Sequence, residues 1–190
     1  SNNLQKPGGK VLKNIIDGDF QGDLYVANPK EAEVQGIPSY QDPNDLPEAE
    51  LAILAIAAKY CPDTVKLFTE KKNTRAFIIL SAGFSEESEE GARLEREVVE
   101  QINRVEGALI GPNCVGMLNQ HYNGVFTTPI PKLDPQGVDF ISGSGATAVF
   151  IMESGIPKGL TFSSVYSVGN SAQMGVEEVL KHMDETDRKS

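Results

Sequence analysis

The sequence predicts an α/β protein whose mostly parallel sheet carries helices on both faces. Short apolar runs of strand length alternate with longer segments in which apolar residues recur at helical spacing. Residues 51–57 are continuously apolar, as expected for a strand that is covered on both sides. Glycine-rich turns follow several runs, at the edge where open α/β sheets bind ligands. The resulting order, αβ, β, αβ, αβ, is a Rossmann-like topology.

The elements of the first part follow from their local patterns. The first helix is expected from Gly9 onward, because Val11, Leu12, Ile15 and Ile16 repeat at helical spacing after a Pro-Gly-Gly turn. A short strand at 23–27 and a Pro-, Gly- and Asp-rich connection at 28–47 come next. The remaining predicted elements are a strand at 51–57, a helix at 61–72, a strand at 76–80, a helix at 88–105 and a strand at 108–110.

A second unit is predicted after an irregular stretch. From Asn119 to Gly137 the sequence has no periodicity, so we expect a connection between two domains, residues 1–125 and 126–190. The predicted elements beyond it are a strand at 138–141, a helix at 146–154, a strand at 160–166 and a helix at 176–183. A fold of this kind opens with a buried strand before its first glycine-rich turn, and we expect that strand to precede Ser1; the alternative is that the fold forms without it. A further strand is expected after the last helix.

Composition narrows the classes of function. The 190 residues are 39% hydrophobic, which suffices for a core. The net charge of −10 disfavours nucleic acids and anionic membranes as partners. No apolar run approaches the ~18 residues of a membrane span, and no signal peptide is recognisable, so a cytoplasmic protein is expected. Cys61 and Cys114 lack partners at metal-ligand spacing, so we expect reduced thiols and no metal site.

Basic residues gather locally in this acidic chain. Lys10 follows Gly8 and Gly9 at the start of the first predicted helix, where N–H groups and the helix dipole favour a phosphate. Lys30 follows Asn28-Pro29 at the end of the next strand and could meet a second phosphate. The alternatives are a helix cap with solvated lysines at the first turn and a plain turn at the second.

Two further turns follow predicted strands at the same edge. Ser81 and Gly83 come after 76–80, and Gly83 permits a close approach by a ligand. This turn also leads into the long helix, which Ser85 or Ser88 is expected to cap beside a group of acids. Those acids are Glu86, Glu87, Glu89 and Glu90.

The turn after 108–110 contains Asn113 and Cys114. Asn113 could hydrogen-bond a ligand amide. Cys114 is expected to be a buried residue and not a nucleophile, because no His or Asp stands at a recognisable spacing. The two histidines, His121 and His182, are expected to be solvated or to cap a helix.

The turn Ser142-Gly143-Ser144-Gly145 lies between a predicted strand and a predicted helix. Ser142, Ser144 and Gly145 could offer hydroxyl and N–H groups to a phosphate or carboxylate, and Asn170, after the next strand, could complete that pocket. The turn lacks the first glycine of a Gly-x-Ser-x-Gly nucleophile elbow. The alternative is an ordinary helix cap.

Six segments of the chain occur in an order that resembles one known family. They are Pro7-Gly8-Gly9-Lys10-Val11, Tyr25-Val26-Ala27-Asn28-Pro29-Lys30, Leu80-Ser81-Ala82-Gly83-Phe84, Ile110-Gly111-Pro112-Asn113-Cys114-Val115-Gly116, Ile141-Ser142-Gly143-Ser144-Gly145-Ala146 and Ser167-Val168-Gly169-Asn170. The set resembles the NDP-forming acyl-CoA synthetases, which include the ADP-forming acetyl-CoA synthetases and the α subunit of succinyl-CoA synthetase.

The resemblance implies a fold, a reaction and a set of contacts. It implies a CoA-binding Rossmann-like domain followed by the start of a flavodoxin-like domain. The implied reaction converts acyl-CoA, NDP and phosphate to a carboxylic acid, CoA and NTP, through an acyl phosphate and a phosphohistidine outside this chain. The expected contacts are Gly8, Gly9, Lys10 and Lys30 near the CoA phosphates, Ser81, Gly83 and Asn113 toward the pantetheine arm, and Ser142, Ser144, Gly145 and Asn170 around the acyl or phosphoryl group.

Departures from the family limit what this chain does alone. The family often has Gln at Gly143, and neither His121 nor His182 matches the phosphorylated histidine. The resemblance implies an ATP-grasp domain or subunit as partner, ATP or ADP with magnesium only in the complete enzyme, an oligomer, and no catalytic residue in this chain, which would be inactive alone. The alternative is a non-catalytic CoA- or nucleotide-sensing module fused to another enzyme such as an acetyltransferase.

Overall fold

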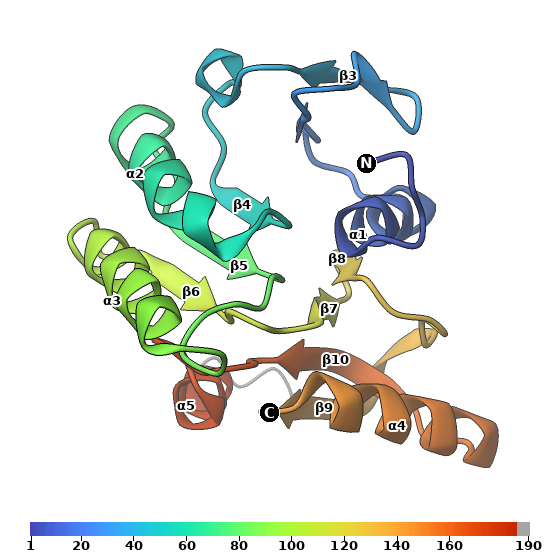
Figure 1. The fold of residues 1–190 in the computed structure, drawn as a ribbon. Coiled ribbons are helices and arrows are strands. Elements are labelled where there is room, and N and C mark those ends of the chain that lie inside the picture. Colours follow the sequence, from blue (N-terminus) through green and yellow to red (C-terminus); the bar gives the residue numbers. More distant parts are fainter. Residues whose placement is uncertain (186–190) are drawn as a thin grey trace.

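A computed structural model describes residues 1–185. It confirms the predicted fold class, an α/β arrangement in which a parallel sheet is flanked by helices (Figure 1). The strands are distributed over three small sheets. Among the described residues, no helix has the length and apolar character needed to cross a membrane.

The parallel sheet contains three strands and has helices on both faces. Its strands are β4 (Leu51–Leu54), β5 (Ala76–Ile79) and β6 (Ala108–Ile110), in that order. Phe77 and Ile79 pack with α2 (Cys61–Lys71) and α3 (Glu89–Asn103), whereas Ile78 and Leu80 pack with α1 (Pro7–Asp17). This alternation follows the period of two along a strand. Because both faces of the strand are covered, every residue from 76 to 80 is apolar.

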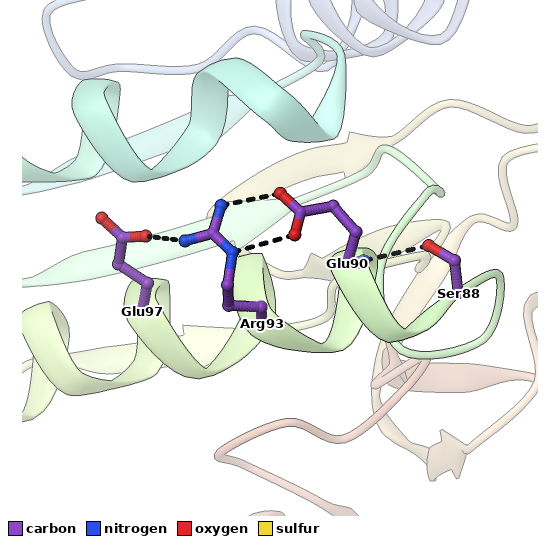
Figure 2. Close-up of polar contacts among 5 residues, drawn as sticks. Ser88, Glu90, Arg93 and Glu97 are labelled. Carbon is purple, nitrogen blue, oxygen red and sulfur yellow. Dashed lines mark hydrogen bonds and ion pairs between the residues drawn. The ribbon is translucent and has the colours of Figure 1, made fainter.

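The long helix α3 begins as its sequence predicts. Ser88 is the N-cap, and its Oγ accepts a hydrogen bond from the Gly91 N–H at 3.0 Å. Figure 2 shows this cap and the exposed side chain of Arg93, which lies between Glu90 and Glu97 and binds both carboxylates. Solvent screens such exposed pairs and leaves them little net effect, so the apolar face of the helix dominates its stability.

A separate small sheet occupies the segment that we predicted to be a connection. It consists of β1 (Val26–Ala27), β3 (Ile37–Tyr40) and β2 (Glu33–Val34), in that order. The predicted strand at 23–27 is therefore shorter than expected and pairs with β3 instead of joining the parallel sheet. Tyr25 and Ala27 are exposed and Val26 is only half-buried, so this strand lacks the two apolar faces that a central strand needs.

The third sheet has four strands, β8 (Tyr122–Val125), β7 (Gly116–Asn119), β10 (Phe162–Ser167) and β9 (Leu133–Ser142). β9 and β10 are parallel, and β7 runs antiparallel to β10 and β8. The prediction of an irregular stretch from Asn119 to Gly137 is wrong at both ends, because β8 and the first half of β9 lie there. The sheet contains strands from both sides of the boundary proposed between residues 125 and 126, and that boundary stays a prediction.

The chain after β10 packs against the first sheet. Residues 170–174 run along β6, where the N–H groups of Asn170, Ala172 and Met174 donate to carbonyl groups between Leu109 and Pro112 at 2.9–3.3 Å. The Gln173 side chain adds an acceptor for the Leu109 N–H at 2.6 Å. The second unit, with α4 (Gly145–Gly155) and α5 (Val176–Glu185), is thereby attached to the first along a strand edge.

Candidate functional site

Two clefts lie where the two units meet, and both are lined by Phe126. The first, of about 310 Å³, is bordered by the N-terminus of α1, the segment 126–128 and one residue of α4. We call it the lysine cleft, after Lys6 and Lys10 in its lining. The second, of about 390 Å³, lies between the turn after β6, the N-terminus of α4 and the turn after β10. We call it the amide cleft, after Asn113 and Asn170.

The lysine cleft has the properties of an anion site. Helix α1 starts after Lys6 without a side-chain cap and without an acidic residue in its first turn. The positive end of its dipole therefore borders the cleft together with two ammonium groups. Lys10, half-buried on the first turn, lies in the position that the sequence predicts for a phosphate contact.

Gly8 and Gly9 have a packing role in the first turn of α1. A Cβ at Gly9 would lie 2.2 Å from the Asn3 carbonyl oxygen, so this buried glycine lets the N-terminal segment cross the helix closely. A Cβ at Gly8 would lie 3.0 Å from the Ala55 side chain. Neither glycine is part of the lining of the lysine cleft, and their contact with a phosphate stays a prediction.

The turn between β4 and α2 lies at the same edge, and sequence reasoning missed it. It connects the predicted sites, since Ala55 is next to Gly8 and Ala58 lies 3.2 Å from the position of a Cβ at Gly83. We had assigned residues 51–57 entirely to a strand, but β4 ends at Leu54. The sequence signal for this turn is Ala-Ala-Lys-Tyr before Cys-Pro. It places an exposed lysine, Lys59, at the same edge of the sheet as the predicted sites.

Lys30 is exposed and is part of the lining of neither cleft. Its N–H donates to Asn28 Oδ1 at 3.0 Å, and the Asn28 amide donates to Glu31 at 2.8 Å. This geometry is that of the plain turn that we gave as the alternative. Glu31 also accepts from the Asn2 N–H, so the turn lies beside the N-terminal segment that covers α1.

The amide cleft brings together residues that were predicted to serve different parts of a ligand. Asn113 lies 3.4 Å from Asn170, measured from Nδ2 to Oδ1, and both line the cleft with Ser144 and Gly145. The Asn113 N–H donates to the Ser81 carbonyl at 2.9 Å, so the turn after β5 is adjacent. Ser81, Gly83 and Ser142 are not part of the lining itself.

The hydroxyl groups at the start of α4 have partners within their own turn. Ser144 Oγ caps the helix by accepting from the Thr147 N–H at 3.3 Å. Ser142 Oγ donates to the Ser144 carbonyl at 2.8 Å and accepts from its N–H at 3.1 Å. The capping alternative thus describes this turn, and anion binding by Ser142, Ser144 and Gly145 stays a prediction.

Cys114 lies at the base of the amide cleft as a neutral thiol. Burial raises the pKa of Cys114 to about 12, and its Sγ donates to the Ile79 carbonyl at 3.3 Å. Burial likewise raises the pKa of Cys61 to about 12. A thiol in this state is a poor nucleophile, which supports the expectation that Cys114 is not catalytic. Within residues 1–185, His, Cys, Asp and Glu side chains form no group of three able to hold a metal ion.

Comparison with protein families gives two matches. Residues 1–120 match the model of the family described as "CoA binding domain". Residues 135–189 match the model described as "Succinyl-CoA ligase like flavodoxin domain".

Curated relatives extend over nearly all of the chain. The ADP-forming acetate–CoA ligase I of Archaeoglobus fulgidus is 36% identical over 185 residues, which is 96% of this chain and 26% of the relative. The α subunit of ADP-forming acetate–CoA ligase II of Pyrococcus furiosus is 36% identical over 190 residues, which is 98% of this chain and 40% of the relative. The chain thus spans less than half the length of either relative.

Two solved structures are similar to this chain over nearly its whole length. A crystal structure of a protein from Pyrococcus horikoshii is 37% identical, has a TM-score of 0.89, and aligns over 98% of this chain and 43% of its own. The acetyl-coenzyme A synthetase 1 of Ca. Korarchaeum cryptofilum, solved with phosphate and ADP, is 25% identical and has a TM-score of 0.87. That alignment covers 97% of this chain and 39% of the synthetase.

Proposed function

The chain belongs to the CoA-binding domain family, and from this premise we propose that it is the CoA-binding part of an NDP-forming acyl-CoA synthetase. The resemblance stated from the six sequence segments is confirmed by the family match and by relatives that are themselves ADP-forming ligases. The complete protein would convert acyl-CoA, NDP and phosphate to a carboxylic acid, CoA and NTP.

One observation carries the proposal, namely the difference in charge between two clefts that share Phe126. The lysine cleft has two cations and an uncapped helix start, whereas the amide cleft has neutral amides and glycine. CoA has a matching asymmetry, since its nucleotide end is polyanionic and its pantetheine arm is neutral, with two amides and a thiol. Local cations are required in a chain of net charge −10, because long-range repulsion would otherwise oppose binding of a polyanion.

The proposed contacts place the charged end of CoA at the lysine cleft and its neutral arm at the amide cleft. Lys10 would contact the CoA phosphates near Gly8 and Gly9, and Lys30 would add charge from outside the cleft. The pantetheine arm would pass Phe126 toward Asn113, with Ser81 and Gly83 on the adjacent turn. The acyl or phosphoryl group would lie by Ser142, Ser144, Gly145 and Asn170.

The complete enzyme requires parts beyond this chain. The chemistry implied for the family needs a phosphohistidine, an ATP-grasp domain or subunit, and ATP or ADP with magnesium. One relative is itself an α subunit, which supports a partner subunit for this chain, and we propose a cytoplasmic, oligomeric enzyme. The sensing alternative is not favoured, because the relatives named above are ligases.

Calorimetry with CoA and with NADH tests this proposal on the 190-residue chain. CoA should bind, and NADH should not, because the acid that holds the adenosine ribose of the dinucleotide ends the second strand in dinucleotide-binding folds and Asn28 stands there instead. Binding of NADH without binding of CoA would contradict the proposal.

A further inference from the structure

A network of polar side chains joins the turn before α3 to the turn after β10. The Asn170 amide nitrogen donates to Glu86 Oε2 and, at 3.0 Å, to Glu95 Oε2. Ser85 Oγ donates to the same Glu95 oxygen at 2.9 Å. On its other side, Asn170 Oδ1 accepts from Asn113 Nδ2 at 3.4 Å. The network therefore runs from two carboxylates to Asn170 and from Asn170 to Asn113, and both amides line the cleft.

The carboxylates determine which way both amides point. An ionised carboxylate can only accept hydrogen bonds, so the group of Asn170 that faces Glu86 and Glu95 must be its NH₂. Its oxygen then faces Asn113 and requires the NH₂ of that residue. The side-chain oxygen of Asn113 is the group that does not contact Asn170. An isolated Asn amide can adopt either of two orientations. Here the charge of Glu86 and Glu95, which lie outside the cleft lining, determines the orientation of both amides.

Glu86 is itself held in one orientation. Its Oε1 accepts from the Gly83 N–H at 2.7 Å and from the Phe84 N–H at 3.3 Å, which leaves Oε2 for Asn170. Partial burial opposes ionisation, but hydrogen bonds from Asn170 and these N–H groups outweigh it and lower the pKa of Glu86. The group is therefore an acceptor on both oxygens at neutral pH.

We propose that Glu86 and Glu95 are positioning residues that, through Asn170, fix the Asn113 amide with its oxygen as acceptor for an N–H group of the ligand's neutral arm. The inference rests on the proposed CoA-binding function, since a pantetheine arm supplies amide N–H donors. It also assigns Asn170 a positioning role, because its NH₂ is committed to the two carboxylates. The ligand group at Asn113 would be a hydrogen-bond donor and not an anion.

The substitution Glu86→Gln tests the orientation directly. The Gly83 N–H keeps the oxygen of the introduced glutamine toward itself, so the new NH₂ faces the NH₂ of Asn170. Asn170 then retains Glu95 as its only carboxylate acceptor, and the orientation of both Asn amides is no longer fixed. CoA should bind about fivefold more weakly, the equivalent of one neutral hydrogen bond. Adenosine 3′,5′-bisphosphate, which lacks the arm, should bind as it does to the unmodified chain. Glu89→Gln, an equal change of charge on the first turn of α3, is the control and should alter neither affinity.

A reciprocal exchange separates positioning from general loss of structure. Asn170→Asp alone places a third carboxylate beside Glu86 and Glu95 and should weaken CoA binding at least as much as Glu86→Gln. In the double variant Glu86→Gln/Asn170→Asp, the glutamine NH₂ can donate to the introduced aspartate, which still accepts from Asn113, while Glu95 retains Ser85. This variant should recover part of the affinity that Asn170→Asp alone loses, because one of the two carboxylates facing the aspartate is replaced by a donor while Glu95 still opposes it.

A second measurement does not depend on CoA. The side-chain NH₂ protons of Asn170 should exchange slowly in the unmodified chain and severalfold faster in Glu86→Gln, because one of their two carboxylate acceptors is removed. Equal exchange rates in the unmodified chain and in Glu86→Gln would overturn the positioning role. If the unmodified chain binds CoA, equal CoA affinities of these two chains would overturn it as well. Failure of the unmodified chain to bind CoA would overturn the proposed function instead, and the exchange rates would then decide the positioning role.

Discussion

The first turns of α1 and α4 both contain glycine, yet the two helix starts leave different groups available to a ligand. α1 begins after Lys6 with no side-chain cap, beside two lysines. α4 begins after Ser144, whose hydroxyl caps it, and Ser142 is hydrogen-bonded within the same turn. Glycine at a helix start therefore indicates a potential anion site only where the cap is missing and cations are close.

The two clefts also differ in how they are built. The lysine cleft takes its charge from one helix end, and its cations are local to the sequence. The amide cleft depends on contact between distant segments, since Asn113 and Asn170 are 57 residues apart. We therefore expect substitutions at the turn after β10 to affect folding of the amide cleft, and substitutions of the cleft lysines Lys6 and Lys10 to affect binding alone.

The largest expected effect is on the amide cleft. Gly169 has φ +56°, and a Cβ there would lie 2.2 Å from the Pro112 carbonyl oxygen. Gly169→Ala should lower the free energy of unfolding by about 3 kcal/mol, because backbone strain and a steric clash add. Urea unfolding measures this loss, and amide NMR should show shifts around Asn113 with few around Lys10.

Gly159→Ala is the matched control. Gly159 also has a positive φ, +86°, but a Cβ there would have no atom within 4 Å. It should cost only about 1–2 kcal/mol, the penalty of the left-handed conformation alone. Equal losses in the two variants would mean that the turn after β10 is not held closely against Pro112.

A middle-sized effect is expected in the lysine cleft. Lys10→Ala should weaken CoA binding by ~1 kcal/mol or more and reduce its salt dependence, because a charge-assisted contact is removed. Lys30→Ala should have a smaller effect, since Lys30 is exposed outside both clefts. Calorimetry at two salt concentrations measures both.

Lys13→Ala changes the charge equally and serves as the control for these two variants. Lys13 pairs with Asp17 on the same helix and is part of the lining of neither cleft. If Lys13→Ala weakened CoA binding as much as Lys10→Ala, the cation effect would be long-range and not a property of the lysine cleft.

The smallest effect on stability is expected at Gly143, which lines the amide cleft. A Cβ at Gly143 would meet no atom within 4 Å, and its φ is not in the left-handed region. Gly143→Gln should therefore change the free energy of unfolding by less than about 0.5 kcal/mol, while its side chain occupies part of the cleft. Thermal unfolding checks the first expectation, and weaker phosphate binding in the cleft, followed by amide NMR, checks the second. A large loss of stability would show that the space at Gly143 is filled.

Regular periodicity was sufficient to predict much of the fold. The helix α3 lies within two residues of its predicted bounds, and β6 has the predicted bounds, because each presents a clear apolar pattern. β8 and the start of β9 were missed because Gly124, Pro135 and Gly137 interrupt their alternation. The conformation of β9 is stabilised by pairing with the distant strand β10, which no local window contains, whereas β8 pairs with the adjacent β7.

The candidate site was predictable by position but not by role. Strand order placed Ser81, Asn113 and Asn170 at one edge. Sequence could not indicate that residues 1–3 cover Gly9, that Lys30 belongs to an outlying turn, or that Glu86 binds Asn170. Each of these depends either on a contact between segments more than five residues apart or on hydrogen bonds within a single turn.

The segment 170–174 that pairs with β6 limits where this gene can be divided. A fusion or a recombination event that separated residues 1–125 from the rest would leave the backbone of β6 without those hydrogen-bond partners and β7 without β10. An unpaired strand edge invites association with other chains. A separately folded first unit is therefore expected to require residues up to at least Met174, beyond the family match to residues 1–120.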